Sequence, residues 1–512
     1  MIVFSIIGVT FNILANQSAS FIARIVTRRL RHDLFSKVQS LSNRQIDELT
    51  MPSIISRLST DTYNVHQMVG MMQRIGVRAP ILLIGGIIVT LTLDAHLTLI
   101  LLCVLPLIVL ATIIISKLGI PLFNKVQISI DNMIRVIREN ISGVRVIKAL
   151  TKMDYEKNRF QKVNKEVMQY ELKSGYTMTT LNPIINIFLN AGLVLVVVVG
   201  AMRIKDGTTE VGKVMAFTSY FTIILNAMLS ITRIFMVFSR SIASLARINY
   251  ILDMKQDLIV EEIEPKQSEY LIEFNNVDFS YNKKELNLEN INFKIKEGQT
   301  LGIIGATGSG KTTIINLLLR FYDISDGEIL INGNNIKSIN PKELKEMFGI
   351  AFQNDTIFSD TIKENIIFGR NITDEDLQKA IKVSQSKEFI ENQPDKLDTI
   401  LTPKGTNISG GQKQRLYIAR ALAGNPKILI LDDSSSALDY KTDSLLRQEI
   451  QANYNCTMIV VAQRISSIKH CDNIVVLDEG KMVGYGNHEY LMNNSTIYNE
   501  IYQSQMGGGI DE

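Results

Sequence analysis

The chain has 512 residues, of which 46% are hydrophobic, and its formal net charge is +3. This length is too large for one hydrophobic core, and so small a net charge does not favour a protein that binds nucleic acid through a concentrated basic face. The three cysteines, Cys103, Cys456 and Cys471, have no paired spacing, which argues against a disulfide framework or a zinc site.

The first half of the chain is predicted to be a membrane domain, because apolar runs crowd its first 235 residues. The run that starts at Pro80 is twice the length of about 20 residues that one helix needs to cross a bilayer, so we expect two spans with a turn at 94–96. A second pair of spans follows at 184–200 and 214–235, and the opening segment supplies another. The sequence therefore predicts five spans.

Basic residues predict which connections lie in the cytoplasm. The opening span lacks the basic stretch that precedes the apolar core of a signal peptide, and arginines follow it at 24, 28, 29 and 31. The connections at 24–75 and 117–180 are rich in Lys and Arg and have helical apolar spacing, which predicts helices that extend into the cytoplasm. The basic loop at 201–213 weakly opposes this orientation. Since five spans would start outside the cell, we expect that a first helix is absent.

Two polar stripes interrupt the last two spans. Each recurs every four residues, and the stripes are Asn182, Asn186 and Asn190, and Thr222, Asn226 and Ser230. Polar side chains in a membrane helix face either a partner helix or a wet cavity, and the spacing does not choose between the two. Neither stripe contains a charge, which disfavours a proton-coupled carrier.

The second half contains a phosphate-binding loop between an apolar strand and an amphipathic helix. The loop follows the pattern G-x-x-x-x-G-K-[ST], and its residues are Gly305, Ala306, Thr307, Gly308, Ser309, Gly310, Lys311, Thr312 and Thr313. The glycines let backbone N–H groups turn toward phosphates, Lys311 reaches the terminal phosphates, and the Thr312 hydroxyl is placed for Mg²⁺. We therefore expect ATP and Mg²⁺ as cofactors.

Two later segments add to this site. The apolar run "KILILDD" is typical of a buried parallel strand, and Asp432 at its end would complete the coordination of the metal. In "NISGGQKQR", Ser409, Gly410 and Gly411 precede a helix that begins near Gln412, and such a helix start is a second anion site. One domain has no evident need of two phosphate sites, so one of them is expected to serve another subunit.

At this point the chain resembles an ATP-binding cassette exporter half-transporter over essentially its whole length. The cassette motifs occur in the family's order. Tyr281 resembles the aromatic residue that stacks on adenine, and Gln353 in "AFQND" resembles the Q-loop glutamine, which also binds the metal. "ISGGQ" resembles the signature with Ile408 in place of leucine, "LILDD" resembles the Walker B strand, and "SALD", which ends at Asp439, resembles the D-loop. In the first half, "ISRLSTD" and "ENISGVRVIKAL" resemble the family's intracellular loops.

The resemblance implies an all-α polytopic membrane domain followed by an α/β P-loop nucleotide-binding domain. We predict a membrane domain at 1–252 with long cytoplasmic helical loops, a linker at 253–270, the cassette at 271–506 and a short tail at 507–512. Membrane lipids and a small-molecule substrate are expected partners, and nucleic acid is not.

Two departures from the family pattern fall on one active site. The family usually has glutamate after the Walker B aspartate and histidine in the later switch segment, where this chain has Asp433 and Gln463, so the expected catalytic residues are Asp433, Gln463 and Gln353. Aspartate is one methylene shorter than glutamate, and glutamine cannot become cationic near neutral pH. A further departure, Thr402 and Pro403 just before the signature, touches the segment that is thought to relay to the membrane loops. We expect tight ATP binding with slow hydrolysis.

The function expected from the resemblance is ATP-driven export of amphipathic small molecules or lipids across the plasma membrane. The pattern resembles heterodimeric bacterial multidrug-type exporters, in which one chain has the degenerate site and its signature completes the competent site of a different chain with the usual Glu and His. The alternatives are a homodimeric slow exporter or lipid flippase, and a regulatory or gating subunit. A soluble cassette ATPase of nucleic-acid repair or translation is opposed by the predicted spans, and an importer usually encodes its membrane and cassette parts separately.

Overall fold

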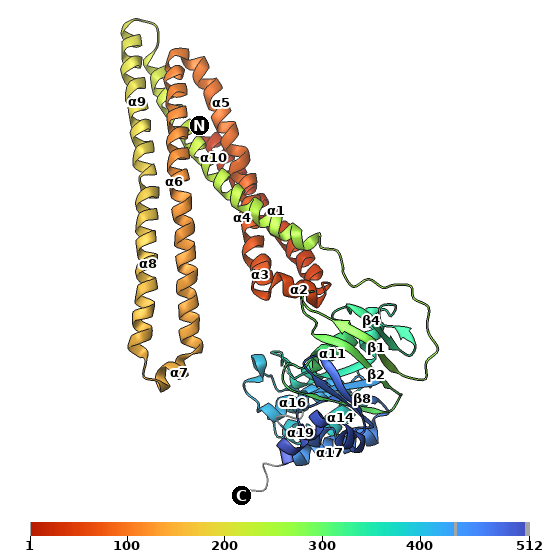
Figure 1. Ribbon diagram of the computed structural model, residues 1–512. Helices are drawn as coiled ribbons and strands as arrows, with labels where there is room; N and C mark the ends of the chain where they lie inside the picture. Colours follow the sequence, from red (N-terminus) through yellow and green to blue (C-terminus); the bar gives the residue numbers. More distant parts are fainter. Residues whose placement is uncertain (1, 354, 435–437, 507–512) are drawn as a thin grey trace. The chain divides into compact units, whose positions relative to one another are not determined.

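The computed structural model describes residues 2–353, 355–434 and 438–506, and in these the chain separates into two compact units. The helical unit comprises the described residues up to Gln39 together with Pro52–Met254, and the sheet unit comprises Ser40–Met51 together with the described residues from Lys255 onward. Figure 1 shows the helices of the first unit and the sheet with its covering helices in the second. The predicted tail at 507–512 lies outside the described residues.

The helical unit is built from long helices. In chain order they are α1 (Ile2–Gln39), α3 (Met51–Ser56), α4 (Thr62–Met71), α5 (Val77–Leu93), α6 (Ala95–Ser142), α7 (Val144–Ala149), α8 (Met153–Thr179), α9 (Leu181–Lys205) and α10 (Val211–Leu252), with π-helical segments at Arg57–Asp61 and Met72–Gly76. Five helical stretches among the described residues are long and apolar enough to cross a membrane, so the predicted number of spans is confirmed.

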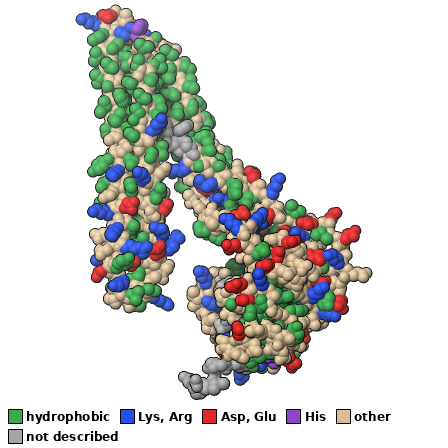
Figure 2. Space-filling view, viewed as in Figure 1, with side chains coloured by type: hydrophobic (Ala, Val, Ile, Leu, Met, Phe, Trp, Pro, Cys, Tyr) green, Lys and Arg blue, Asp and Glu red, His purple; other side chains and the backbone are tan. Residues whose placement is uncertain are grey.

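Several of these helices are longer than a bilayer is thick. With 48 residues, α6 is about 72 Å long at about 1.5 Å per residue, against a hydrocarbon core of about 30 Å. Figure 2 shows hydrophobic side chains over one end of the helical unit and charged side chains along the other end. The helices therefore continue beyond the membrane, as the apolar spacing of the long connections predicted.

One positive charge of the basic loop at 201–213, which opposes the predicted orientation, is paired with a carboxylate. The Nε atom of Arg203, in the last turn of α9, lies 3.1 Å from Oδ2 of Asp94. The other carboxylate oxygen of Asp94 accepts the N–H groups of His96 and Leu97 and so caps α6. The ion pair therefore fastens the turn between α5 and α6 to the end of α9.

Small residues let the helices of this unit approach closely. The core lies between α6, α9 and α10 and includes Leu101, Ile108, Phe217 and Phe221, all of which are buried. A Cβ atom added at Gly192 would lie 2.7 Å from Cζ of Phe221, so only glycine fits there. Such close contacts replace the hydrophobic effect, which does not drive helices together in lipid.

The sheet unit contains a sheet with the strand order β5-β4-β1-β2-β10-β9-β3-β8-β7-β6. The strands are β1 (Ile272–Phe279), β2 (Leu288–Ile295), β3 (Thr300–Gly305), β4 (Asp326–Ile331), β5 (Asn334–Asn335), β6 (Phe348–Ala351), β7 (Ile428–Asp432), β8 (Thr457–Val461), β9 (Asn473–Asp478) and β10 (Lys481–Gly486). Neighbours are parallel from β9 through β3, β8 and β7 to β6, whereas β5, β4, β1 and β2 are antiparallel.

The helices of this unit that follow β3 in the chain pack on the sheet or on one another. They are α11 (Lys311–Leu318), α12 (Pro341–Glu346), α13 (Ile362–Ile367), α14 (Asp374–Val383), α15 (Lys387–Glu391), α16 (Gly410–Leu422), α17 (Tyr440–Asn453), α18 (His488–Asn494) and α19 (Thr496–Met506). The parallel strands are apolar almost throughout, as in β7, where each residue is buried. This is the pattern expected of a parallel sheet that has both faces covered.

The sheet unit also includes α2 (Asn43–Leu49), which comes from between α1 and α3. A capping box between Ser42 and Gln45 starts this helix, and the same two side chains hydrogen-bond Asp257 Oδ2 at 2.8 Å and the Lys255 carbonyl at 2.7 Å. The predicted domain bounds place this segment within 1–252, and those bounds stay a prediction.

A pair of adjacent glycines in α5 tests the close packing. Gly86→Ala would bring its methyl carbon to 2.5 Å from Cγ1 of the buried Ile224, whereas the Cβ of Gly85→Ala would meet nothing within 4 Å. Overpacking costs about 1 to 3 kcal/mol, so Gly86→Ala should lower the midpoint of thermal unfolding in detergent. Gly85→Ala is the matched control and should leave the midpoint unchanged or raise it, because alanine favours a helix. Equal midpoints would contradict the packing argument.

Candidate nucleotide-binding site

Four adjacent parallel strands bring the predicted phosphate-binding, metal-binding and catalytic residues to one edge of the sheet. The phosphate loop follows β3, Gln463 follows β8, Asp432 and Asp433 end β7, and Gln353 follows β6, and these strands are neighbours in the order β3-β8-β7-β6. The carboxyl ends of parallel strands are the usual place for a ligand in an open α/β sheet. Residues that are far apart in the sequence therefore meet here.

The backbone conformation of the phosphate loop requires glycine at several positions. Gly308 and Gly310 have φ angles of +86° and +102°, which residues with a side chain rarely adopt. A Cβ atom at Gly305 would lie 2.2 Å from the carbonyl oxygen of Leu477, so the start of the loop also requires glycine. The buried Oγ of Ser309 has no hydrogen-bond partner in the structure. A phosphate oxygen would satisfy this donor, and the loop therefore fits a polyphosphate.

Lys311 begins α11 and points back into the loop. Its ammonium group donates to the carbonyl oxygens of Gly305 and Ala306, each at 2.8 Å. Burial lowers the pKa of Lys311, and the charges of Asp432 and Asp433 oppose that shift. An ammonium ion that is half-buried and bonded only to neutral carbonyls gains from an anionic ligand, which is the role the sequence predicts for it.

Asp432 is the buried acid at the end of β7, with an exposed fraction of 3%. Burial raises its pKa to about 6, the neighbouring charge of Asp433 adds to the shift, and Lys311 and the hydroxyl of Thr312 oppose it. A cation would stabilise the ionised form of this buried carboxylate. Mg²⁺ suits the position because it prefers oxygen ligands. The residues present therefore fit a magnesium ion at Asp432 and Thr312.

Asp433 is held by side chains from two other loops. Its Oδ2 accepts a hydrogen bond from Nε2 of Gln353 at 3.0 Å and from Nε2 of Gln463 at 3.3 Å. Its φ angle of +47° is unusual for a residue with a side chain, and its own N–H donates to the Val461 carbonyl at 2.9 Å. Burial raises the pKa of Asp433, whereas the Gln353 bond lowers it. The three residues expected to be catalytic thus form one hydrogen-bonded group.

Tyr281 lies beside the start of α11. Its hydroxyl donates to Oγ1 of Thr313 at 3.2 Å and accepts from Nδ2 of Asn316 at 3.2 Å. The rings of Phe279 and Tyr322 stand nearly perpendicular to it, with centroids at 4.7 Å and 5.0 Å. Asn316 was not foreseen from the sequence, although its place on α11, five residues after Lys311, could have indicated a contact with the loop.

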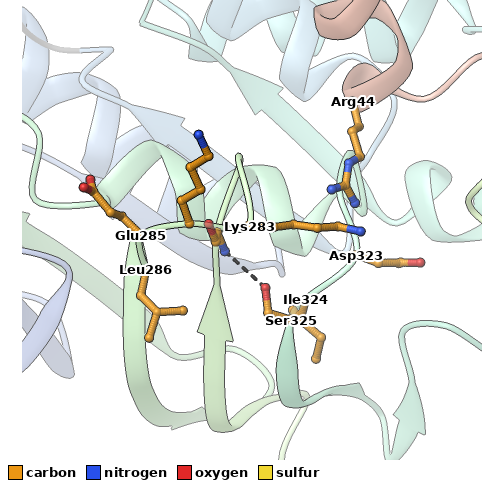
Figure 3. Close-up of a pocket in the computed structure, with 9 residues that line it drawn as sticks. Arg44, Lys283, Glu285, Leu286, Asp323, Ile324 and Ser325 are labelled. Atoms are coloured by element: carbon orange, nitrogen blue, oxygen red, sulfur yellow. Dashed lines mark hydrogen bonds between the residues drawn. The ribbon is translucent and has the colours of Figure 1, made fainter.

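An open hollow of about 480 Å³ is lined by Ser280 and by residues 283–286 and 323–325, together with Arg44. Figure 3 shows Arg44 of α2 and Lys283 reaching toward Asp323 in this hollow, beside the hydrogen bond from the Ser280 N–H to the Ser325 hydroxyl. The hollow thus mixes cationic and acidic side chains.

The signature and D-loop residues cap two helices. Ser409 caps α16 and forms a capping box with Gln412, and Gly410 begins that helix with Gly411 next to it. Asp439 caps α17 through Thr442. Among the hydrogen bonds of the described residues, none joins Ser409 or Asp439 to the phosphate loop, and residues 436 and 437 of "SALD" lie outside the described part. The start of α16 is thus separate from the phosphate loop among these hydrogen bonds, and its role as a second anion site stays a prediction.

Comparisons with known proteins agree with this architecture. Residues 1–228 match the family model of the ABC transporter transmembrane region, and residues 288–436 match that of the ABC transporter. The chain is similar to an uncharacterized ABC transporter ATP-binding protein, YfiB, of Bacillus subtilis, with 34% identity over 98% of this chain and 88% of the relative. It is also 34% identical, over 72% of its length and 65% of the relative's, to a putative multidrug export ATP-binding/permease protein of Staphylococcus aureus.

A solved structure is similar over almost the whole chain. It is described as a bacterial Atm1-family ABC exporter with ATP bound, and it superposes with a TM-score of 0.84 over 97% of this chain and 88% of the other. The sequence identity is 24%, so the likeness concerns the fold. The helical unit followed by an α/β unit is the fold class that the sequence predicts.

The raised pKa of Asp432 predicts proton release when Mg·ATP binds. Because the folded-state pKa of about 6 lies above the ordinary value of 3.8, Asp432 is mostly protonated at pH 5.5, and a metal that takes the carboxylate must displace the proton. The affinity for Mg·ATP should therefore fall about tenfold for each pH unit below 6. Protonation of the nucleotide itself would add a separate change in affinity.

Calorimetry in two buffers of different ionisation enthalpy measures the protons released at pH 5.5. Asp432→Asn, titrated at higher nucleotide concentration, is the control that retains the titration of the nucleotide but lacks that of the acid. The wild-type chain should release most of one additional proton. Equal release by both proteins would show that Asp432 is already ionised before the metal arrives.

Proposed function

This chain belongs to the ABC transporter family, and we propose that it is one half of a dimeric exporter whose own site binds ATP firmly and hydrolyses it slowly. It is a multi-span protein of the plasma membrane with its cassette in the cytoplasm, and its ATP-binding domain couples ATP use to transport. The observation that carries the proposal is the group formed by Gln353, Asp433 and Gln463.

Firm binding follows from groups that are complete in this chain. The loop from Gly305 to Thr313 has the glycines, the lysine and an unsatisfied serine hydroxyl that a triphosphate requires. Tyr281 would stack on the adenine, and Thr312, Gln353 and Asp432 would hold Mg²⁺. When bound, Mg²⁺ would offset negative charge on the phosphates. The chain thus supplies the phosphate, metal and base contacts on its own side of the nucleotide.

Slow hydrolysis follows from what surrounds Asp433. A general base must reach within about 2.6–3.2 Å of the proton it takes, and aspartate is one methylene shorter than the family's usual glutamate. Burial raises the pKa of Asp433, but its Oδ2 atom is already shared by two amide donors, and the bond from Gln353 opposes that rise. Gln463 can hydrogen-bond a phosphate but cannot carry a positive charge. Both groups therefore favour holding a phosphate over activating water.

The signature of this chain supports a role in a second site. Ser409, Gly410 and Gly411 lie at the start of the 13-residue helix α16, whose N–H groups and dipole favour an anion. We assign this helix start to the nucleotide of a partner half-transporter, which is a different chain with glutamate and histidine at the two altered positions. ATP would draw the two cassettes together and turn the membrane cavity outward, and hydrolysis at the partner's site would reset it.

A homodimer is the second candidate, either as a slow exporter or lipid flippase or as a regulatory gate. It is favoured by the same near-complete signature, which would serve an identical copy equally well. In that arrangement both sites would contain Asp433 and Gln463, and the whole pump would turn over slowly.

The polar stripes support an uncharged, partly polar cargo such as an amphipathic small molecule or a lipid. Asn182, Asn186 and Asn190 on α9 are exposed, and so are Thr222 and Asn226 on α10. The Asn226 amide donates to the carbonyl of Thr222 in its own helix at 2.9 Å. These groups are therefore available to cargo or to a second chain.

Restoring the family's residues should speed hydrolysis. Asp433→Glu with Gln463→His should raise the ATP turnover of the purified chain by about 10²-fold, since a general base contributes about 10²–10⁴ in rate. Lys311→Ala in the restored background is the control, and it should abolish the gain because the phosphates lose their lysine. No gain from the double substitution, or brisk turnover by the unaltered chain without a second polypeptide, would refute the slow-site proposal.

The stripes can be tested by transport. Asn186→Leu should lower export of an amphipathic dye from vesicles by about threefold to tenfold while the basal ATP turnover stays within about twofold, because one polar contact to cargo is lost. Ile187→Ala, on the neighbouring exposed position, is the matched control and should change transport little. Equal effects of both substitutions would remove the stripe from the cargo path.

A further inference from the structure

The segment that carries Gln463 is held by a side chain of the C-terminal helix α19. The Nε2 atom of Gln505 donates to the Gln463 carbonyl oxygen at 2.8 Å, and its Oε1 atom accepts from the Ile465 N–H at 2.9 Å. Arg464 between them is extended, with φ −106° and ψ 129°. In an extended chain the carbonyl of one residue and the N–H two residues later face the same edge.

The amide of Gln505 thus takes the place that a peptide group of a neighbouring strand would occupy. Strand β8 ends at Val461, so these two backbone groups lie beyond the ladder that pairs β8 with β3 and β7. Backbone groups outside a ladder need another partner to stay in one position. Gln505 supplies both partners from a single side chain.

Gln505 is itself fixed by the core of the sheet unit. Three side chains on the same face of α19 precede it by seven, four and three residues, and they are Tyr498, Ile501 and Tyr502. Tyr498 is fully buried, and its hydroxyl lies 2.8 Å from Nδ1 of His488. Ile501 and Tyr502 pack against the core cluster that includes Ile465. The position of the Gln505 amide is therefore set by packed residues, although the amide lies near the surface.

We propose that Gln505 is a positioning residue for ATP hydrolysis, which acts through Gln463. The Gln463 amide reaches Asp433 Oδ2 at 3.3 Å, so a fixed backbone at 463 fixes one of the two bonds on that carboxylate. Gln505 hydrogen-bonds the backbone of this segment and acts on the carboxylate only through it. The role concerns the geometry of position 463, and it holds whether hydrolysis at this site is slow or brisk.

The test uses the full-length chain in lipid nanodiscs. Gln505→Ala removes both hydrogen bonds, and Gln505→Glu keeps an acceptor for Ile465 but turns a carboxylate oxygen toward the Gln463 carbonyl. Gln503→Ala is the matched control, because Gln503 is an exposed residue of the same helix. Radiolabelled ATP gives kcat and KM, a fluorescent nucleotide gives the Kd of Mg·ATP, and thermal unfolding reports the fold.

We expect Gln505→Ala to lower kcat about threefold to tenfold, the effect of losing one or two hydrogen bonds. The Kd of Mg·ATP should change by less than about twofold, because the phosphate loop is untouched, and Gln505→Glu should lower kcat at least as much. Gln503→Ala should behave as the wild-type chain. In a Gln463→Ala background, Gln505→Ala should have no further effect, since the side chain through which it acts is gone.

Other results would overturn the inference. An unchanged kcat in both Gln505 variants would show that position 463 needs no support from α19. The same loss in the Gln463→Ala background, or a Kd that rises as much as kcat falls, would show that Gln505 serves the fold alone. The outcome does not depend on the slow-site proposal, which is judged separately by the substitutions at 433 and 463.

Discussion

Two adjacent carboxylates at the end of one buried strand constrain the whole nucleotide site. Asp432 and Asp433 repel each other in a partly desolvated place, and burial raises the pKa of both. Different neighbouring groups stabilise the two carboxylates. Asp432 lies near Lys311 and the Thr312 hydroxyl, and Asp433 accepts hydrogen bonds from the amides of Gln353 and Gln463. The first acid is left ready for a cation, and the second is occupied by hydrogen bonds. This division between the two acids is what supports the proposal that the pocket binds a nucleotide firmly and hydrolyses it slowly.

The parallel half of the sheet makes this arrangement possible. The neighbouring strands β8, β7 and β6 are followed by Gln463, by Asp433 and by Gln353, and Asp432 is the last residue of β7. The phosphate loop follows β3, which lies on the other side of β8. Each strand fixes where its following loop starts, and the hydrogen bonds across the loop ends then fix the side chains. Gln505 extends the same principle, because its amide continues the pairing of the chain where β8 has ended.

The sequence predicts those parts of the molecule that are encoded locally. The phosphate loop places its glycines, its lysine and its threonines within nine consecutive residues, and the spans are long apolar runs, which the structure confirms in number. Contacts between distant residues carry no such pattern. Tyr322 and Asp47 are 275 positions apart, and Gln505 and Gln463 are 42 positions apart, so neither pair could be anticipated. The inclusion of Ser40–Met51 in the sheet unit is of the same kind, since it depends on hydrogen bonds to Lys255 and Asp257.

The aromatic residues around Tyr281 connect this residue to α2. The Tyr322 hydroxyl donates to Oδ2 of Asp47 on α2 at 2.6 Å, and burial together with this bond raises the pKa of Tyr322. The Tyr322 ring stands perpendicular to that of Tyr281, whose hydroxyl reaches Thr313. A series of side-chain contacts within the sheet unit therefore runs from α2 through Tyr322 and Tyr281 to Thr313, and it links the position of α2 to that of the residue predicted to stack on adenine.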